Sequence, residues 1–366
     1  MKLIHCADLH LDAKMSANLD KESAKIRRGE ILHTFERMVS YAVENEVEAI
    51  LIAGDLFDTK NISATARNTV LHAITEHPQI RFYYLKGNHD KDNFLTGLET
   101  VPENLKLFTD AWTTYEEAEG RINISGIELS ASNLGSAHVT LLPDAKKFNI
   151  VMLHGQEAES DAKDKAEIIN LKLFRNKGID YLALGHIHGY KKEALDARGL
   201  YCYPGCLEGR GFDECGEHGF VLLEIDEESG HFTHTFVPFA QRKLYTVEVD
   251  VTDCTTTVEM QDRAREVLKE MGCEPNALLK IVLKGMVDVS CEKDLTYFLS
   301  AFRQNFFFVK VYDETTLKVE IEDYLLDMSL KGEFVRQVME DESIGEDDKK
   351  VIIRYGLQAI AGEEVQ

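Results

Sequence analysis

The stretch LALGHIHGY, residues 182–190, ends a buried apolar strand in two histidines, His186 and His188, with a glycine on either side. Side chains of an extended chain repeat every second residue, so both imidazoles point to the same side of the chain. One histidine at a strand end is usually held by a backbone hydrogen bond. Two on the same side favour a ligand site, provided that the rest of the chain supplies further ligands.

Four earlier segments end in the same way, with polar side chains directly after an apolar run. They are IHCADLH with Asp8 and His10, LIAGD with Asp55, YYLKGNHD with Asn88, His89 and Asp90, and VMLHG with His154. Ligands of open α/β sheets bind at the carboxyl ends of the strands, so we expect these groups to meet in one cleft. Buried carboxylate, amide and imidazole groups are unfavourable unless they are paired or coordinated.

Strands and helices alternate in the first half of the chain, which predicts the α/β class with a largely parallel, buried sheet. Helical spacing of apolar residues covers about 28–45 and 63–77. Strands are expected at 2–8, 48–55, 80–87, 147–155 and 179–186. The later segments YCYPG, HGFVLLEID and HFTHTFVPF are expected to be antiparallel strands that complete a second sheet.

The pattern restarts near residue 241. Three apolar strands and two amphipathic helices predict a compact β-α-β-α-β unit over 241–318. The last segment is helical and acidic, with 12 acidic and five basic residues after position 320. Its spaced apolar residues indicate a face that packs on something. We therefore expect a large domain at 1–240, a small α+β domain at 241–318 and a helical tail at 319–366.

The formal net charge of −23 limits how the protein can bind nucleic acid. Binding through general electrostatics needs a basic surface, so such a role would depend on a local patch, on bound cations or on a partner. No apolar run approaches the length of a membrane span, and seven scattered cysteines are typical of a reducing compartment. We expect a cytoplasmic protein with no membrane association.

One local cluster raises the question of a zinc site. Its members follow the spacing C-x3-C-x8-C-x2-H and are Cys202, Cys206, Cys215 and His218. Most structural zinc sites contain closely spaced C-x2-C pairs, which this cluster lacks. Buried free thiols are therefore the favoured interpretation.

The ligand groups at the five strand ends are too many for one ion and suit two. Imidazole, carboxylate and amide donors without a thiolate favour Mn²⁺, Fe²⁺ or Zn²⁺ over Ca²⁺. Two such ions about 3.5–4 Å apart can activate a water and stabilise in-line displacement at phosphorus. Asp55, in the middle of the series, is the expected bridging carboxylate.

The ordered series D-x-H, G-D, G-N-H-D, H and G-H-x-H resembles the calcineurin-like metallophosphoesterase superfamily. The segments IHCADLHLD, GDLFD and YPGCLEGRGFDECGEHGFVLLEID are similar to its double-strand-break repair nuclease subfamily, which includes the bacterial SbcD and YhaO-type proteins. The resemblance covers about 1–240 by sequence and 241–318 by architecture alone. It implies a four-layer αββα sandwich, a small α+β capping domain and a helical C-terminal tail.

The resemblance also implies two metal sites. Metal site one would comprise Asp8, His10, Asp55 and His188. Metal site two would comprise Asp55, Asn88, His154 and His186. Manganese is the expected ion, with iron, zinc and magnesium as alternatives.

Two further residues receive catalytic roles from the resemblance. His89 would contact the scissile phosphate and protonate the leaving oxygen, and Asp90 would orient His89. Archaeal and eukaryotic relatives carry a histidine at the position of Asp58, so substrate contacts there should follow the bacterial pattern. Candidate basic residues along the cleft are Lys60, Arg67, Lys86 and Lys91.

These features predict a two-metal phosphodiesterase in which a hydroxide between the ions attacks phosphorus in line. The resemblance makes it a manganese-dependent DNA exonuclease or endonuclease of a DNA repair complex. Its expected partners are DNA and an SbcC-like SMC-type ATPase, which would supply much of the DNA affinity and dock on 319–366. A homodimer is a further option.

The acidic charge favours an alternative from the same superfamily, a small-molecule phosphodiesterase or a protein phosphatase. The small domain at 241–318 counts against that alternative. A scaffold with a vestigial site is disfavoured because every expected ligand position is filled.

Overall fold

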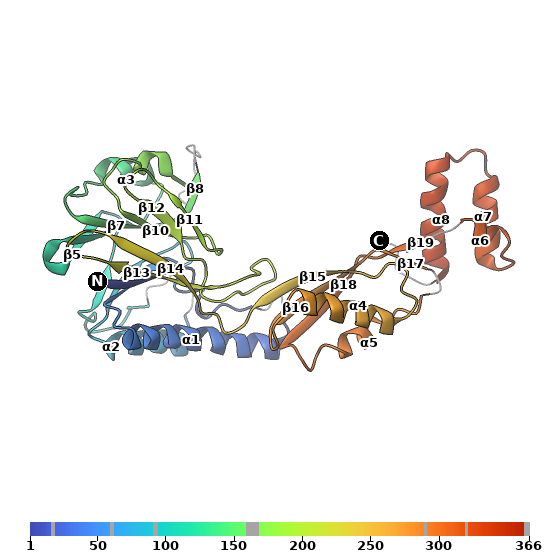
Figure 1. Cartoon of the computed structure of the whole chain (residues 1–366), viewed down its shortest axis with the longest axis horizontal. Helices are drawn as coiled ribbons and strands as arrows, with labels where there is room; N and C mark the ends of the chain where they lie inside the picture. The colour runs from blue at the N-terminus through green and yellow to red at the C-terminus, as the bar shows by residue number, and fades with distance from the viewer. Residues whose placement is uncertain are drawn as a thin grey trace. The chain divides into compact units, whose positions relative to one another are not determined.

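The computed structural model describes residues 1–15, 19–58, 62–90, 94–158, 168–288, 291–318 and 321–361 (Figure 1). The chain divides into two compact units, Met1–Lys243 and Leu244–Gln366. All the predicted metal ligands lie in the first unit. Lys60, Lys91 and most of the acidic segment 156–167 lie outside the described residues.

The first unit contains two six-stranded sheets. The first sheet has the order β14-β13-β1-β2-β3-β4, with β1 at Lys2–Cys6, β2 at Ala49–Ala53, β3 at Arg81–Leu85, β4 at Leu105–Leu107, β13 at Gly219–Ile225 and β14 at Phe232–Pro238. Strands β1 to β4 are parallel, whereas β13 pairs antiparallel with β1 and β14 pairs antiparallel with β13. The parallel part therefore brings the carboxyl ends of β1, β2 and β3 to one edge.

The second sheet has the same kind of parallel centre with antiparallel edges. Its order is β11-β12-β10-β7-β6-β5, with β5 at Thr113–Glu117, β6 at Ile122–Gly126, β7 at Phe148–His154, β10 at Tyr181–Gly185, β11 at Lys191–Ala194 and β12 at Leu200–Tyr203. Strands β6, β7, β10 and β12 are parallel, and β5 and β11 are antiparallel to their neighbours. A short parallel pair, β8 (Gln156–Ala158) and β9 (Ile168–Asn170), follows β7.

The two sheets pack face to face between two layers of helix, which confirms the predicted four-layer sandwich (Figure 1). Helices α1 (Lys21–Glu44) and α2 (Ala64–Thr75) cover the first sheet. The outer face of the second sheet packs on α3 (Leu134–Thr140) and the short 3-10 helix η2 (Leu171–Phe174). Another 3-10 turn, η1 (Ala118–Gly120), links β5 and β6. Strands β2, β7 and β10 are buried along their whole length, as expected for parallel strands covered on both faces.

Helix α1 begins seven residues before the predicted start at 28. Asp20 caps it, because its carboxylate accepts hydrogen bonds from the backbone N–H groups of Glu22 and Ser23. Apolar spacing does not reveal the first two turns because the buried positions there are occupied by the small Ala24 and the charged Arg27.

The prediction that the three segments after residue 188 complete a second sheet is wrong for two of them. Strands β13 and β14 are antiparallel but extend the first sheet beside β1. The third, β12, joins the second sheet but lies parallel to β10. Local sequence specifies that a segment is a strand, and the partner is chosen by long-range packing.

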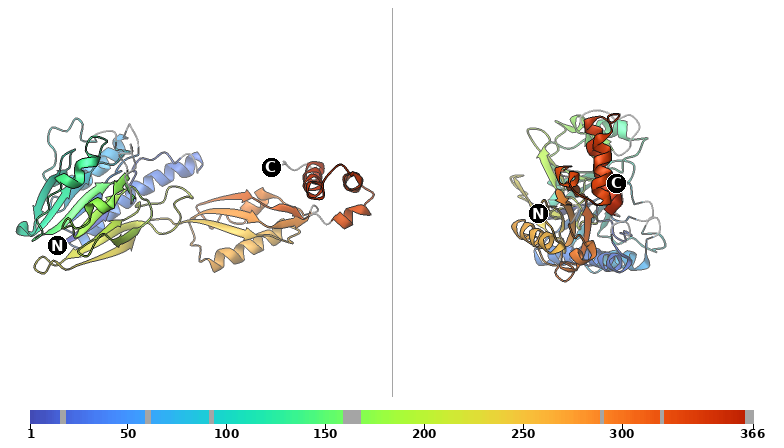
Figure 2. Two further views of the ribbon diagram at one scale, coloured as in Figure 1. Left: turned by 90° about the horizontal axis from the view of Figure 1, so that it is seen from above. Right: turned by 90° about the vertical axis from the view of Figure 1, so that its right-hand side faces the viewer.

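The second unit has a three-stranded parallel sheet in the order β15-β16-β18, with β15 at Leu244–Asp250, β16 at Leu278–Lys284 and β18 at Phe308–Asp313. Helices α4 (Thr257–Glu270) and α5 (Leu295–Ser300) pack on one face, and Figure 2 shows α4 running along it. A two-stranded ladder joins β17 (Met286–Asp288) and β19 (Thr316–Lys318).

The chain continues as α6 (Ile321–Leu325), α7 (Leu330–Glu340) and α8 (Glu346–Ala361). Val335, Val338, Ile353 and Leu357 form a small core between them. Other apolar side chains of this segment are exposed, including Leu326 and Met328 between α6 and α7 and Leu330 at the start of α7. Across the described ranges, no helix is both long and apolar enough to cross a membrane.

Candidate metal centre

The candidate ligands come from strand ends of both sheets. Strands β1, β2 and β3 of the first sheet contribute Asp8, His10, Asp55 and Asn88, and strands β7 and β10 of the second contribute His154, His186 and His188. Strand β2 contacts both β7 and β10 across the sandwich. The predicted convergence on one cleft therefore spans two sheets and not one.

Sharp backbone turns direct several of these side chains. Asp8, His10, Asp55 and His186 all have positive φ angles, of 52°, 45°, 52° and 107°. This left-handed conformation is unfavourable for residues with a Cβ, and such strain concentrates at functional sites. The loop after β1 is held in place by hydrogen bonds from the N–H groups of Asp8 and His10 to the carbonyls of Gly54 and Asp55.

Two glycines allow the close approach of the ligand loops. Gly54 has a φ of 94°, and a Cβ on it would lie 2.1 Å from Nδ1 of His154. A Cβ on Gly87 would lie 2.2 Å from Oδ1 of Asp55. The glycines of the G-D and G-N-H-D motifs therefore make room for ligand side chains from neighbouring strands.

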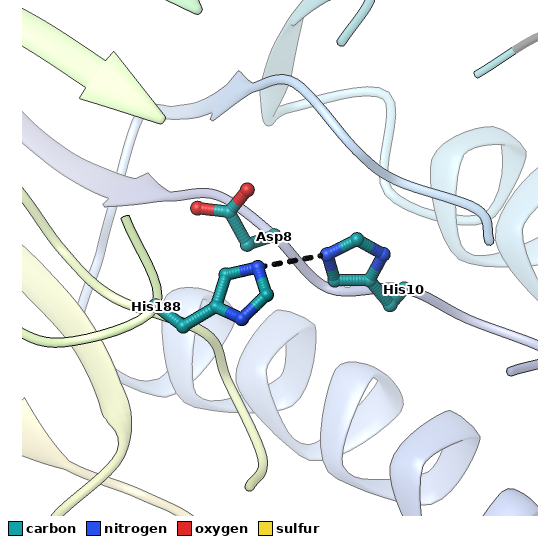
Figure 3. Close-up of side chains that lie close together, drawn as sticks. All are labelled: Asp8, His10 and His188. Carbon is teal, nitrogen blue, oxygen red and sulfur yellow. Dashed lines mark hydrogen bonds between the residues drawn. The ribbon is translucent and has the colours of Figure 1, made fainter. Parts of the chain in front are cut away.

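His10 and His188 point their Nε2 atoms at each other across 3.2 Å (Figure 3). The opposite nitrogen of each ring has a carboxylate partner, since Nδ1 of His10 lies 3.1 Å from Asp58 and Nδ1 of His188 lies 2.7 Å from Glu214. A carboxylate only accepts hydrogen bonds, so these partners favour a neutral ring with its proton on Nδ1, although Nη2 of Arg210 also lies 3.3 Å from Nδ1 of His188. When both rings are neutral, the two Nε2 lone pairs face each other, and a proton or a metal cation shared between them would stabilise this arrangement.

His154 has the same arrangement in the other half of the cleft. Its Nδ1 donates to the carbonyl of Ala53 at 2.9 Å. Its Nε2 faces two oxygens, Oδ1 of Asn88 at 2.9 Å and Oδ2 of Asp55 at 3.4 Å. Burial disfavours the imidazolium, but Asp55 and Asp8 outweigh it and raise the pKa of His154 to about 9. This site also attracts a positive charge.

The carboxylates lie between the histidines. Oδ2 of Asp55 is 3.9 Å from Nε2 of His10 and 3.4 Å from Nε2 of His154, so Asp55 contacts both halves. Burial raises the pKa of Asp8 to about 6, although both of its oxygens accept the backbone N–H of His186. The ligand atoms of Asp8, His10 and His188 lie within 4.8 Å of one another, as do those of Asp8, Asp55 and His154.

His186 occupies a different position from the other ligand candidates. Its ring meets that of His154 edge-on, with centroids 5.4 Å apart. Among the described residues, it belongs to none of the close groups of three ligand atoms. The family resemblance implies that it belongs to metal site two, with His154.

Asp58, and not Asp90, contacts the ring of His89. Nδ1 of His89 lies 3.1 Å from Oδ1 of Asp58. Asp90 is buried, and its two oxygens accept the backbone N–H groups of Leu56, Phe57 and Gly87 at 2.9–3.2 Å. The expectation that Asp90 orients His89 is corrected by these contacts, because its carboxylate instead ties the loop after β2 to the loop after β3.

Two charged residues that the strand-end pattern does not include, Arg210 and Glu214, border the site. Glu214 accepts from His188 at 2.7 Å and from Nη2 of Arg210 at 3.0 Å. Burial opposes its ionisation, but His188 and Arg210 hold the pKa of Glu214 well below its usual range. Neither residue follows a ligand strand, so the strand-end pattern could not find them.

Arg67 and Lys86, two of the expected basic cleft residues, have local partners. Arg67 donates to the carbonyl of Thr96, and Lys86 lies near the carboxyl group of Glu128, whose pKa it lowers against a larger upward effect of burial. The structure therefore gives them contacts within the fold.

The cysteine cluster is not gathered around one point. Cys202 and Cys206 are buried, Cys215 is exposed, and Sγ of Cys206 lies 3.2 Å from Nδ1 of His218. In the described part of the chain, no close group of three ligand atoms includes any of these residues. This arrangement agrees with free thiols and not with a zinc site.

Comparison with known proteins places the fold and the site in context. Residues 1–190 match the family model of calcineurin-like phosphoesterases. The chain is 29% identical over 302 residues to an uncharacterized metallophosphoesterase, YhaO, of Bacillus subtilis, which covers 78% of this chain and 72% of that protein.

Two archaeal proteins described as DNA double-strand break repair protein Mre11 are also similar. The protein of Methanopyrus kandleri is 24% identical, over 79% of this chain and 69% of its own length. The protein of Sulfolobus acidocaldarius is 22% identical, over 96% of this chain and 94% of its own length. The second similarity extends through both units.

Proposed function

Because the chain belongs to the calcineurin-like phosphoesterase family, a family of phosphoester hydrolases with a dimetal centre, we propose that it is a two-metal phosphodiesterase that cleaves DNA. The observation that carries the proposal is the facing pair of Nε2 atoms of His10 and His188 beside buried Asp8 and Asp55. Lone pairs and carboxylates that converge in this way fit divalent cations. Manganese is the proposed physiological ion.

The residues present fit two ions. Asp8, His10, Asp55 and His188 would hold one at metal site one, and Asp55, Asn88, His154 and His186 would hold the other at metal site two. When bound, such ions lower the pKa of water and neutralise charge on a phosphoryl group. Asp55 contacts both His10 and His154 and is the proposed shared ligand.

His89 is the proposed general acid. Its side chain is 48% exposed, so a substrate can reach it, and Nδ1 lies against Asp58. With Asp58 as partner of Nδ1, the proton for the leaving sugar oxygen would leave from Nε2. Asp58 would orient the ring.

DNA is the proposed substrate because relatives similar to both units of this chain are described as DNA double-strand break repair proteins. The test is hydrolysis of labelled single- and double-stranded DNA by the full chain with Mn²⁺, with Mg²⁺ or with chelator. A chromogenic phosphodiester, bis(p-nitrophenyl) phosphate, is measured alongside. Chelator-sensitive DNA cleavage supports the proposal, and end-labelled products distinguish exonuclease from endonuclease action.

A second candidate has specific support in the charge of −23, which opposes DNA binding by general electrostatics. In that case the same centre would hydrolyse a small phosphodiester or a phosphoprotein. Cleavage of only the chromogenic compound, with DNA intact at every metal and salt concentration, would favour this candidate over the nuclease.

For the remaining parts of the chain, we propose a capping domain at 241–318 and a docking element for an SbcC-like ATPase at 319–366. Support for docking comes from the exposed side chains of Leu326, Met328 and Leu330, which are 88%, 91% and 72% accessible. Changing all three to serine should abolish co-purification with that ATPase while the chromogenic phosphodiester is still hydrolysed. Leu142→Ser, at an 88% exposed leucine of the first unit, is the matched control.

A further inference from the structure

The loop 206–214 contributes no proposed metal ligand, but two of its residues lie beside the site. Glu214 contacts His188, and Arg210 lies near Asp58, the carboxylate that contacts His10 and His89. Glu214 accepts the Nδ1 proton of His188 through Oε1. The same carboxylate accepts Nη2 of Arg210 at 3.0 Å, and its other oxygen accepts the backbone N–H of Arg210 at 2.7 Å. The orientation of His188 therefore depends on how this loop is held.

Arg210 also reaches the other side of the site. Its Nη1 lies 3.7 Å from Oδ1 of Asp58, the oxygen that is 3.1 Å from both His10 and His89. The arginine side chain is only 18% exposed. One guanidinium thus lies between two carboxylates, each of which contacts the Nδ1 atom of at least one site histidine.

We propose that Arg210 is a positioning residue that fixes Asp58 and Glu214 together and thereby orients His10, His188 and His89. The role rests on the proposed two-metal function and adds a residue to it. A planar guanidinium with several donors can hold both at once, and its charge is permanent.

A buried ion pair between Arg27 of helix α1 and Glu208 of the loop holds the loop in place. Arg27 and Glu208 are 0% and 2% exposed and join through Nη2 and Oε2 at 2.9 Å. Arg27 also donates to the carbonyl of Gly209, directly before Arg210, and Thr34 donates to Glu208 at 2.7 Å. Helix α1 therefore sets the position of the Arg210 backbone, so the guanidinium is held in place before substrate binds.

The test compares Arg210→Met and Arg210→Lys with the wild-type full chain. Mn²⁺ binding to metal-free protein is measured by calorimetry, together with kcat and KM for bis(p-nitrophenyl) phosphate and the Tm. The matched control is Arg198→Met, because Arg198 is a partly buried arginine that pairs with Asp180 and two backbone carbonyls. Arg198 contacts none of the candidate ligands in the described hydrogen bonds.

We expect Arg210→Met to lower the affinity for Mn²⁺ at metal site one by about 10–100-fold and to lower kcat by about the same factor. KM and the affinity of the other ion should change by less than about threefold. Arg198→Met should lower the Tm without changing the affinity for Mn²⁺ at either site. Arg210→Lys should recover only part of the loss, because one ammonium cannot hold both carboxylates in a planar fork.

Wild-type affinity for both ions and wild-type kcat in Arg210→Met would overturn the proposal. A raised KM with both affinities intact would also overturn it, since Arg210 would then bind substrate directly. If Arg210→Met does not fold, full activity and metal binding in Arg210→Lys would contradict the role. Failure of the wild-type chain to bind two ions would instead refute the proposed function, and the role of Arg210 with it.

Discussion

Nε2 of His10 and Nε2 of His188 face each other at 3.2 Å although they come from different sheets of the sandwich. Each ring has its Nδ1 proton fixed by a carboxylate, of Asp58 or of Glu214. The two Nε2 atoms are therefore directed at the same point from opposite sheets. Two strand ends 178 residues apart in the chain meet at this point, so loss of either histidine should lower metal binding at metal site one.

Single histidine variants should empty the two metal sites separately. His188→Ala removes a proposed ligand of metal site one, and His186→Ala removes a proposed ligand of metal site two. We expect each variant to retain about one Mn²⁺ where the wild type binds two, because the other ligand set stays complete. Metal analysis after gel filtration gives the stoichiometry. Equal loss of both ions in both variants would show that the sites do not bind independently.

Stability of the metal-free protein should fall as pH rises from about 6.5 to 9. Asp55 and Asp8 raise the pKa of His154 from 6.5 to about 9, so the folded state binds this proton more tightly than the unfolded chain does. The stabilisation is complete below pH 6.5 and is lost as pH passes through 9. His188, whose pKa is also raised, contributes in the same direction.

The expected decrease in Tm over this range is on the order of 5–10 °C. Calorimetric scans of the chelated protein at several pH values measure it. With saturating Mn²⁺ the decrease should disappear, because the cation takes the place of the proton. An equal slope with and without metal would show that His154 is not a ligand.

His89→Asn should slow DNA cleavage by about 10²–10⁴-fold, the usual contribution of a general acid. The loss should be much smaller for bis(p-nitrophenyl) phosphate, because nitrophenolate leaves without protonation. Metal stoichiometry should stay at two, since His89 belongs to neither proposed ligand set. Equal losses on both substrates would mean that His89 binds the phosphate and does not protonate the leaving group.

The sequence pattern predicted the α/β class and the region of the site because both depend on local features, whereas the four-layer sandwich was implied by the family resemblance. Apolar runs, glycines and polar strand ends can be seen in short segments such as the one that contains Asn88 and His89. The partners of β13 and β14 could not be predicted, because sheet order depends on contacts between distant segments. Arg27 and Glu208 were missed for a related reason, since a buried ion pair looks like two surface charges in the sequence.

The hydrogen-bond partners of the Asp58 and Asp90 carboxylates could not be predicted either. Both carboxylates lie close to His89 in space or in sequence, and adjacency in sequence suggested Asp90. In the structure, three backbone N–H groups donate to Asp90, and the imidazole of His89 contacts Asp58. Local turn geometry decided between them, and turn geometry is only partly encoded in residue type.

Asp58→Asn and Asp90→Asn should therefore have different effects. Asp58→Asn should lower kcat on DNA by about 10–100-fold with little change in Tm, because the carboxylate is 26% exposed and acts on His89 and His10. Asp90→Asn should lower the free energy of unfolding by about 1–3 kcal/mol, because an amide leaves buried N–H donors unpaired.

The comparison uses kcat per bound Mn²⁺ pair and the urea midpoint of each variant. Residual activity of folded Asp90→Asn should stay within about threefold of the wild type at saturating metal. The reverse result, a catalytic loss in Asp90→Asn and a pure stability loss in Asp58→Asn, would restore Asp90 as the partner of His89. Both variants nearly keep the side-chain volume. The changes in kcat and in the urea midpoint therefore report the loss of each carboxylate charge and not a change in packing.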